Sequence, residues 1–464
     1  MSPGMDDPSA RTTVQTPSTA RRTSPTLVIL VFVGFISLGL PDGLLGVAWP
    51  SIRQTFGLPI DALGALFFTT VCGYLTASLT SGWVVQRIGV GMLLTLSAFA
   101  TAASLLTFAL TPAWGPIVVA GILAGLGGGA IDAGLNSYVA LAHSPRMLSW
   151  LHAFFGVGAA TGPAITLAVL DAGQPWQLGY AIVGGGQLLL GLCFLLTRRQ
   201  WKVAKSAPTP QPPPPRTGEG EREHVGARCI APTTSSLAAC APATSAPAAS
   251  APATSAHTAS APIAPAISSW TPAVWLSILL FLVYTGIETA AGQWAYTLFV
   301  EGRGIAAWAA GIGISAYWGA LAVGRVLAGL VAERISPTTL TRASMLGMLV
   351  GAVAIWANLA TWTSFAGLVL MGLAAAPVFP AMVAVTPARF GAAAAATIIG
   401  FQVAAASLGI AGLPALSGVL AARVGLEVIP TVLVLGSIGM VALHETVVRL
   451  AHPQASRRPS AAGA

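Results

Sequence analysis

The stretch Gly121–Ala140, GILAGLGGGAIDAGLNSYVA, decides how this chain folds. It is long and apolar enough to cross a bilayer, which takes about 20 residues, yet it carries a carboxyl group in its interior. Gly125, Gly128, Asp132 and Asn136 follow one another at spacings of three and four, so they share one face of a helix. An acid that faced lipid would be costly to insert. The sequence therefore predicts that Asp132 points into protein or into a water-filled cavity.

The whole chain has the composition of a membrane protein. Of its 464 residues, 55% are hydrophobic and 8% are charged, and the mean hydropathy is +0.77. A soluble domain of this size would need several times more charge at its surface. The net charge of +8 lies mainly in predicted loops and tails, so it does not indicate a nucleic-acid partner. The four cysteines show no disulfide or metal-ligand spacing.

Twelve apolar segments are long enough to span a bilayer, and they fall into two groups of six. Those of the first half are Leu27–Trp49, Ile60–Ser81, Met92–Leu110, Trp114–Leu141, Ser149–Leu170 and Leu178–Thr197. Those of the second half are Pro272–Phe299, Ala307–Val331, Leu340–Ala360, Trp362–Thr386, Ala392–Ala421 and Glu427–Val448. The pattern predicts an all-α membrane protein with two six-helix bundles, residues 27–197 and 269–448.

Polar segments flank and separate the two predicted bundles. Residues 198–268 contain four consecutive prolines and two copies of APATSA, which predicts a disordered linker. Residues 1–26 and 449–464 are expected to be polar tails. Lys and Arg gather in these segments and in the loops on the same side, whereas the opposite loops hold only Arg53, Arg303 and Arg423. This asymmetry predicts a multi-pass protein of the inner (plasma) membrane with the linker and both termini in the cytoplasm.

The two halves repeat each other. Gly82-Trp-Val-Val-Gln-Arg87-Ile-Gly89 follows the second span, and Gly329-Leu-Val-Ala-Glu333-Arg334 follows the eighth. Asp42 in the first span and Glu288 in the seventh stand at corresponding positions of the two halves. Two repeats of the same sense, joined by a long linker, are typical of parallel repeats around an axis along the membrane normal.

These motifs resemble the major facilitator superfamily. The resemblance rests on the two loops, whose motif residues are Gly82, Arg87, Gly89, Gly329, Glu333 and Arg334. The first loop departs from the family pattern, because Gln86 stands where the family usually has an acid. Within the superfamily, Pro41-Asp42-Gly43 and the Asp132 motif resemble the fucose permease-like branch of fucose:proton symporters. That resemblance implies proton coupling through Asp42 and Asp132.

Three acids lie well inside predicted spans: Asp42, Asp132 and Glu288. Burial in a low-dielectric site favours the neutral form of a carboxyl group, which can then ionise when water or a partner arrives. Such behaviour is what coupling to a proton gradient requires. The alternative is a structural acid satisfied by hydrogen bonds between helices. Pro41 should also kink the first span and leave the carbonyl oxygen of Ser37 without its helical partner.

Several further residues could contact a solute. A sugar site needs amide or acid groups for hydroxyls and an aromatic face for the ring. The candidates are Asn136, His152, Glu288, Gln293, Trp294, Trp318 and Gln402. The alternative for each is structural, since a lone histidine is more often a core residue and tryptophans also line membrane interfaces. Arg325, the cation inside a span, is interpreted as structural, packing against the Glu333-Arg334 loop.

The function predicted is secondary active transport by alternating access, with proton-coupled uptake of a small polar solute such as a monosaccharide. The main alternative is proton-coupled efflux of amphipathic compounds, of the multidrug type. A third is a membrane sensor that has lost transport. Sodium is a possible coupling ion in place of protons. We expect no enzyme activity, no cofactor and no metal site, because nucleotide-binding loops, metal-ligand spacings and nucleophile–base pairs are missing. The expected partners are the lipid bilayer and the solute, and the protein is expected to be monomeric.

Overall fold

The computed structural model describes residues 25–142, 145–201, 271–331 and 334–451. Most of the predicted linker, the two tails and Glu333 lie outside these ranges. The helices of the first half are α1 (Pro25–Phe56), η1 (Ile60–Ala62), α2 (Leu63–Ile88), α3 (Val90–Leu110), α4 (Trp114–Ala142), α5 (Pro145–Asp171) and α6 (Gln177–Thr197). Those of the second half are α7 (Pro272–Thr297), η3 (Leu298–Gly302), α8 (Ala307–Val331), α9 (Pro337–Ala357), α10 (Thr361–Ala375), α11 (Val378–Phe390), α12 (Ala392–Val424) and α13 (Val428–Ala451).

The twelve predicted spans are confirmed, because twelve helical segments within the described residues are long and apolar enough to cross a membrane. The tenth span differs from the prediction in being broken into α10 and α11. The break falls at Pro377, whose ring lacks an N–H group and clashes with the carbonyl oxygen one turn earlier. The twelve spans therefore carry thirteen α-helices.

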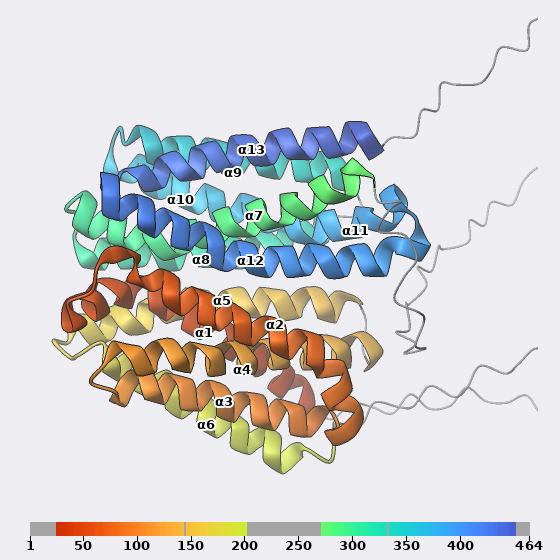
Figure 1. Cartoon of the computed structure of the whole chain (residues 1–464), viewed down its shortest axis with the longest axis horizontal. Helices are drawn as coiled ribbons and strands as arrows, with labels where there is room; N and C mark the ends of the chain where they lie inside the picture. The colour runs from red at the N-terminus through yellow and green to blue at the C-terminus, as the bar shows by residue number, and fades with distance from the viewer. Residues whose placement is uncertain (1–24, 143–144, 202–270, 332–333, 452–464) are drawn as a thin grey trace, which may run out of the picture. The chain divides into compact units, whose positions relative to one another are not determined.

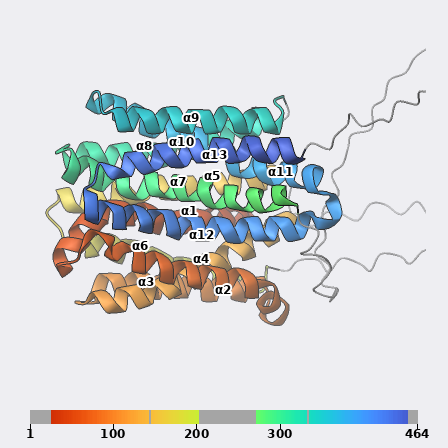
Figure 2. The same cartoon turned by 45° about the horizontal axis from the view of Figure 1, so that its top comes forward.

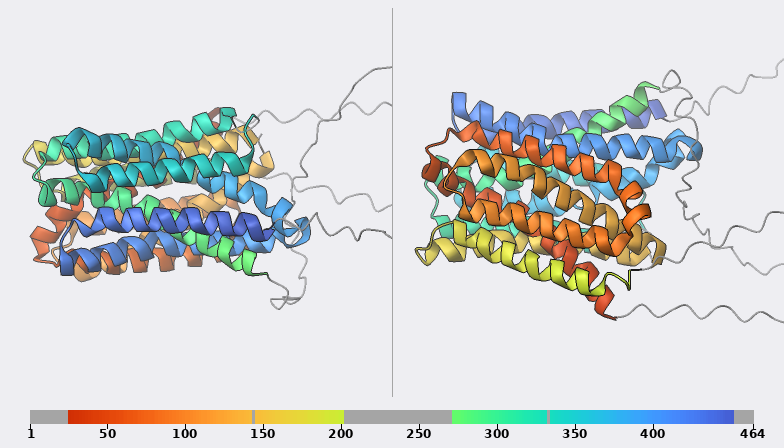
Figure 3. Two further views of the ribbon diagram at one scale, coloured as in Figure 1. Left: turned by 90° about the horizontal axis from the view of Figure 1, so that it is seen from above. Right: turned by 60° about the horizontal axis from the view of Figure 1, so that its bottom comes forward.

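The helices of both halves run side by side along one direction (Figures 2 and 3). Figure 1 shows α1–α6 on one side and α7–α13 on the other. Successive spans alternate in direction, so the first residue of α1, the last of α6, the first of α7 and the last of α13 lie at the same end. We call it the linker end, and the other the opposite end.

Small residues let helices of the first half approach closely. A Cβ atom on Gly125 of α4 would lie 1.9 Å from the backbone oxygen of Thr70 on α2. A Cβ atom on Gly39 of α1 would lie 2.1 Å from the backbone oxygen of Phe155 on α5. Only glycine fits at such crossings, which are typical of helix pairs in membranes. The α2–α4 crossing brings the polar face of α4 against α2.

The two halves are in contact at the opposite end and also along α5 and α8, where a Cβ atom on Gly156 would lie 2.6 Å from the Cβ atom of Ala322. Arg53 at the end of α1 forms a 2.5 Å ion pair with Glu301 of η3. Gly46 precedes Arg53 in α1 by about two helical turns. A Cβ atom on Gly46 would lie 3.1 Å from the backbone oxygen of Gly292 on α7. The pairs α1–α7, α2–α12 and α5–α8 carry the contact between halves. The main packing partners of α4 are α1, α2, α3 and α5, and those of α11 are α9, α10 and α12, so neither helix adds much to that contact.

The loop motif is only partly described. Gly89 ends α2 with φ +79°, a backbone conformation that favours glycine. The guanidinium group of Arg87 stacks over the ring of Trp83 at 3.9 Å. A side chain on Gly82 or Gly329 would meet no described atom within 4 Å. Because Glu333 lies outside the described residues, the acid of the second copy has no structural account.

Candidate functional site

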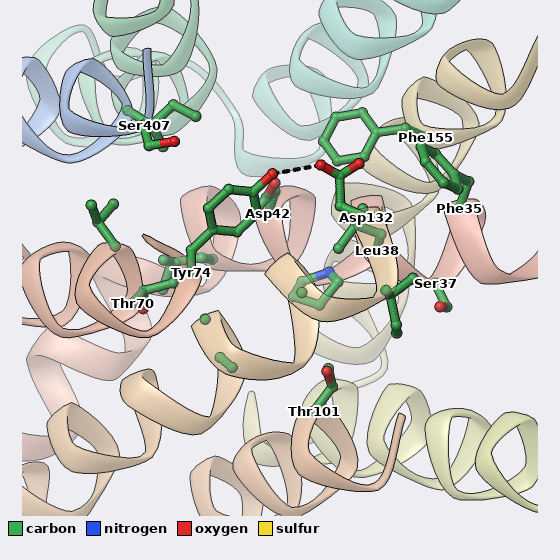
Figure 4. Close-up of a pocket in the computed structure, with 18 of the residues that line it drawn as sticks. Phe35, Ser37, Leu38, Asp42, Thr70, Tyr74, Thr101, Asp132, Phe155 and Ser407 are labelled. Atoms are coloured by element: carbon green, nitrogen blue, oxygen red, sulfur yellow. Dashed lines mark hydrogen bonds between the residues drawn. The ribbon is translucent and has the colours of Figure 1, made fainter. Parts of the chain in front are cut away.

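A cavity of about 500 Å³ lies between the two halves. Its walls come from all six spans of the first half and from α7, α8, α11 and α12 of the second. The four residues of the polar α4 face, Gly125, Gly128, Asp132 and Asn136, all line it. Asp42, His152 and Glu288 line it as well. Five of the predicted proton-coupling and solute-binding residues are thus brought together, and Figure 4 shows Asp42 and Asp132 on the wall of the first half.

Asp132 is held by two hydrogen bonds. The hydroxyl of Tyr74 on α2 donates to its Oδ2 at 2.7 Å (Figure 4), and Asn136 Nδ2 donates to its Oδ1 at 2.9 Å. Asn136 follows Asp132 by one helical turn, as the sequence spacing requires. Both bonds are donated to the carboxyl group, which is the arrangement that stabilises an ionised acid. Asn136 Oδ1 is buried without a described partner.

Asp42 lies exposed on the cavity, and none of the described residues donates a hydrogen bond to its carboxyl group. Its backbone oxygen accepts a hydrogen bond from Gln293 Nε2 of α7 at 2.9 Å. Pro41 lies inside α1, as expected, and the oxygen of Ser37 accepts instead from Gln187 Nε2 of α6 at 3.0 Å. A side chain of a neighbouring helix thus replaces the amide that proline lacks.

Glu288 belongs to a cluster in the second half. Tyr317 donates to its backbone oxygen at 2.7 Å, and Arg325 Nη2 lies 3.8 Å from its Oε1. The Tyr284 hydroxyl contacts Glu288 Oε2 and also lies 2.9 Å from the backbone oxygen of Ala375. A phenol carries one hydrogen. Both contacts are therefore hydrogen bonds at the same time only when Glu288 is protonated and donates to Tyr284.

His152 is exposed on the cavity near the linker end of α5. Its ring meets the ring of Phe35 edge-on, with centroids 5.5 Å apart. Its backbone oxygen accepts a 3.0 Å hydrogen bond from Arg325 Nη1. The contact joins the two halves on the cavity wall.

Gln293 and Trp294 lie outside the cavity lining in this structure. Both are buried where α7 packs against other helices. Gln293 bonds the backbone of Asp42, and Trp294 Nε1 donates to the backbone oxygen of Pro414 at 2.9 Å. Their contacts hold helices together, which corresponds to the structural alternative.

Trp318 and Gln402 also lie outside the lining. Trp318 packs where Gly292 leaves room for its ring, and a Cβ atom on Gly292 would come within 2.3 Å of that ring. Gln402 Nε2 donates to Ser277 at 3.2 Å, and Thr386 donates to Gln402 Oε1 at 3.2 Å. Both side chains are almost fully buried. Helical spacing alone did not fix which side of these helices faces the cavity.

The structure adds to the interpretation of Arg325. The residue lines the cavity and contacts His152 and Glu288, while Glu333 of the loop that follows α8 lies outside the described residues. Two further residues were missed, Tyr74 and Gln187. Tyr74 stands inside an apolar span, and its polar hydroxyl in that position was the available signal. Gln187 could have been found as the partner that the freed Ser37 carbonyl needs.

Among the described residues, no group of His, Cys, Asp and Glu side chains is arranged to hold a metal ion. A central cavity between two six-span bundles, with acids on its wall, defines an integral multi-pass membrane transporter rather than an enzyme. The chain belongs to the Major Facilitator Superfamily, whose family model matches residues 31–357. The superfamily predicted from the loop motifs is thereby confirmed.

The chain is similar to two transporters in sequence and to a third in fold. The 3-(3-hydroxy-phenyl)propionate transporter of Escherichia coli is 26% identical over 416 residues, covering 87% of this chain and 89% of the relative. The glucose/mannose transporter of Bacillus subtilis is 25% identical over 148 residues, or 32% of this chain and 37% of the relative. The crystal structure of a D-xylose-proton symporter has a TM-score of 0.64 at 13% identity, covering 89% of this chain and 96% of the other. That last likeness concerns the fold.

Proposed function

We propose that the protein couples the movement of protons to the uptake of a small polar solute such as a monosaccharide. The observation that carries the proposal is that Asp42 and Asp132 face one cavity between two bundles. A cavity of about 500 Å³ falls in the size range of small-molecule sites. Acids inside membrane spans mark ion and substrate pathways by default.

The two acids differ in a way that suits a proton carrier. Asp132 has two hydrogen-bond donors that favour its ionised form, while Asp42 faces the cavity with no described donor. Asp42 or Asp132 takes a proton on one side of the membrane and releases it on the other. Solute binding and protonation both favour the same conformational switch, so the two fluxes are coupled. Sodium is the alternative ion for the same carboxyl groups.

The described conformation fits one stage of alternating access. The halves are joined at the opposite end by Arg53–Glu301, while α4 and α11 stay within their own halves. In our proposal this is the state closed on the outside, with the linker end and both termini in the cytoplasm. The protein works as a monomer in the inner membrane, since both bundles that form the cavity belong to one chain.

Relatives support solutes of two kinds. The names of two proteins similar to this chain refer to sugars, glucose or mannose and D-xylose, and one of them also to protons. Another is named for a hydroxylated aromatic acid. The resemblance of Pro41-Asp42-Gly43 and of the Asp132 motif to the fucose permease-like branch supports the sugar class.

A second candidate is proton-coupled efflux of amphipathic compounds. It is favoured by the walls of the cavity, where aromatic and aliphatic side chains are numerous. Phe35 and Phe155 stand on the first half, and Phe379, Val403 and Ile410 on the second. A drug-susceptibility profile of cells lacking the protein separates the candidates, because an exporter protects cells and an uptake system does not.

The test of the main proposal is solute uptake into proteoliposomes with an imposed proton gradient. We expect Asp132→Asn to abolish gradient-driven accumulation while sparing exchange of solute across the membrane. Asp171→Asn serves as a matched control, since that exposed acid lies outside the cavity lining. Unchanged accumulation in Asp132→Asn would refute the role of this acid.

A further inference from the structure

The cavity wall of the second half carries a cation that the transport scheme above leaves unused. Arg325 is the one Lys or Arg among the described residues that line the cavity. Its side chain is 18% exposed, and its guanidinium group lies 5.8 Å from the centre of the Phe155 ring. Such a group beside an aromatic wall is well placed to meet a solute.

Few of its hydrogen-bond donors are used by the described protein. A guanidinium group has five N–H donors. One hydrogen bond is made, from Nη1 to the backbone oxygen of His152. The 3.8 Å separation from Glu288 is an ion pair that is too long for a hydrogen bond. The hydrogen bond to His152 therefore holds Arg325 in place, and other N–H groups of the guanidinium remain available to a solute in the cavity.

Glu288, the ion-pair partner of Arg325, can also form a hydrogen bond within its own half. Glu288 Oε2 contacts the Tyr284 hydroxyl, which also reaches the oxygen of Ala375. When Glu288 takes up a proton, it donates to Tyr284, and Tyr284 donates to Ala375. The cluster thus accommodates a neutral Glu288 without an unpaired group, and Arg325 then has no counter-ion.

The net charge of the cavity after protonation determines the charge of the solute that it binds best. The carboxyl groups of Asp42, Asp132 and Glu288 become neutral on protonation, whereas an arginine keeps its charge. A proton-loaded cavity is therefore left with the single positive charge of Arg325. An unpaired charge in a site of low dielectric is costly, and an anion removes that cost.

We propose that the transported solute carries a carboxylate group, which pairs with Arg325 when a proton on Glu288 has broken the Glu288–Arg325 ion pair. This inference rests on the proposed function and names the solute class of the same site. The proton binds a carboxylate oxygen of Glu288, and the solute carboxylate takes its place beside the guanidinium group. The charges of the proton on Glu288 and of the solute anion cancel, so the net charge moved in a cycle equals the number of protons that Asp42 and Asp132 carry across. A polar sugar acid or a small aromatic acid has this chemistry.

The groups that face Glu288 are few. Arg325 and Tyr317 come from α8 and Tyr284 from its own helix, while Asp42 of α1 and Asp132 of α4 line the same cavity from the first half. No charged side chain of the described parts of α10, α12 or α13 lines the cavity. His152 also lines the cavity, and its backbone oxygen accepts a hydrogen bond from Arg325. The pH dependence of anion binding is therefore expected to follow Glu288 first and Asp42 second.

Matched solutes test the proposal on the full-length protein. The pairs are D-gluconate with D-glucose, and 3-phenylpropionate with 3-phenylpropanol, so that each acid has an uncharged counterpart. Binding is measured by thermal shift and tryptophan fluorescence at an acidic and a neutral pH. We expect an acid to bind at least about tenfold more tightly than its counterpart, and more tightly at acidic pH.

Variants assign the effect to the two residues. Arg325→Gln should abolish the preference for the acid, while Arg325→Lys, which keeps the charge, should retain part of it. Glu288→Gln imitates the protonated acid, so anion binding should stay strong at both pH values. Arg423→Gln is the control, since it removes an exposed cation outside the cavity lining. Acid binding that survives Arg325→Gln, or no acid binding at all, overturns the proposal.

Flux measurements separate this inference from the proposed function. In proteoliposomes, uptake of the acid should respond to the pH gradient and should be lost in Arg325→Gln. Proton-driven uptake of glucose with inert acids overturns the inference and leaves the proposed function standing. Binding of the acids that requires Arg325, without gradient-driven flux of any solute, supports the inference and overturns the coupling.

Discussion

Breaking the ion pair between Arg53 and Glu301 should shift the protein toward the conformation open at the opposite end. The two side chains come from different halves, 2.5 Å apart, and each is 28% exposed. Exposed pairs are worth about 0.2–1 kcal/mol and hydrogen bonds to charged groups about 1.5–3 kcal/mol. Allowing for solvent screening, we assign this pair about 1 kcal/mol. A free-energy change of about 1.4 kcal/mol changes an equilibrium constant tenfold. Arg53→Gln or Glu301→Gln should therefore raise the population of the open conformation about fivefold.

A single cysteine at a contact between the halves reports that population. In Ala415→Cys, with the native cysteines replaced by serine, the new thiol lies half-buried opposite Gly64 and should be reached more readily when α2 and α12 separate. Its labelling by a membrane-impermeant maleimide should speed up about fivefold in either neutral variant. The exchange Arg53→Glu with Glu301→Arg should restore the slow rate. If single neutralisation left the rate unchanged, or the exchanged pair stayed fast, this ion pair would not be holding the end closed.

Three more substitutions test separate parts of the structure. Tyr74→Phe removes a donor to the ionised form of Asp132, worth about 1.5 kcal/mol, so the pH profile of gradient-driven uptake should move about one unit toward alkaline pH. Gly125→Val places a side chain where even a Cβ atom lies 1.9 Å from a backbone oxygen, so the yield of folded protein on size-exclusion chromatography should collapse, whereas Gly115→Ala in the same helix should be neutral. Gln402→Leu breaks buried hydrogen bonds and should lower the melting temperature while solute affinity stays within about twofold.

The features predictable from the sequence were those that depend on local pattern. Apolar runs of bilayer length identified the twelve spans, because each helix satisfies its own backbone in lipid. The helical spacing of Gly125, Gly128, Asp132 and Asn136 placed all four on the cavity wall. Pro377 is also a helix-breaking signal in the sequence, and it could have predicted the break in the tenth span.

The features that local sequence leaves open depend on how helices are rotated against one another. Arg325 looked like a residue near the end of a span, yet its contacts come from α5 and α7, which local sequence does not identify. Gln402 and Trp318 have the residue types expected of a sugar site, but their helices turn these side chains into packed contacts. Rotation is set by small residues on neighbouring helices, such as Gly292 beside Trp318, and so by pairs of distant positions.

The hydrogen bond from Gln187 to Ser37 has a consequence for how the carrier moves. It ties the turn of α1 before Pro41 to α6, because separating the two helices would leave an amide and a carbonyl group unpaired inside apolar surroundings. The first half should therefore move as a rigid body, with the same internal geometry throughout the transport cycle. The spacing between Asp42 and Asp132 would then be constant, and only their separation from Glu288 would open and close.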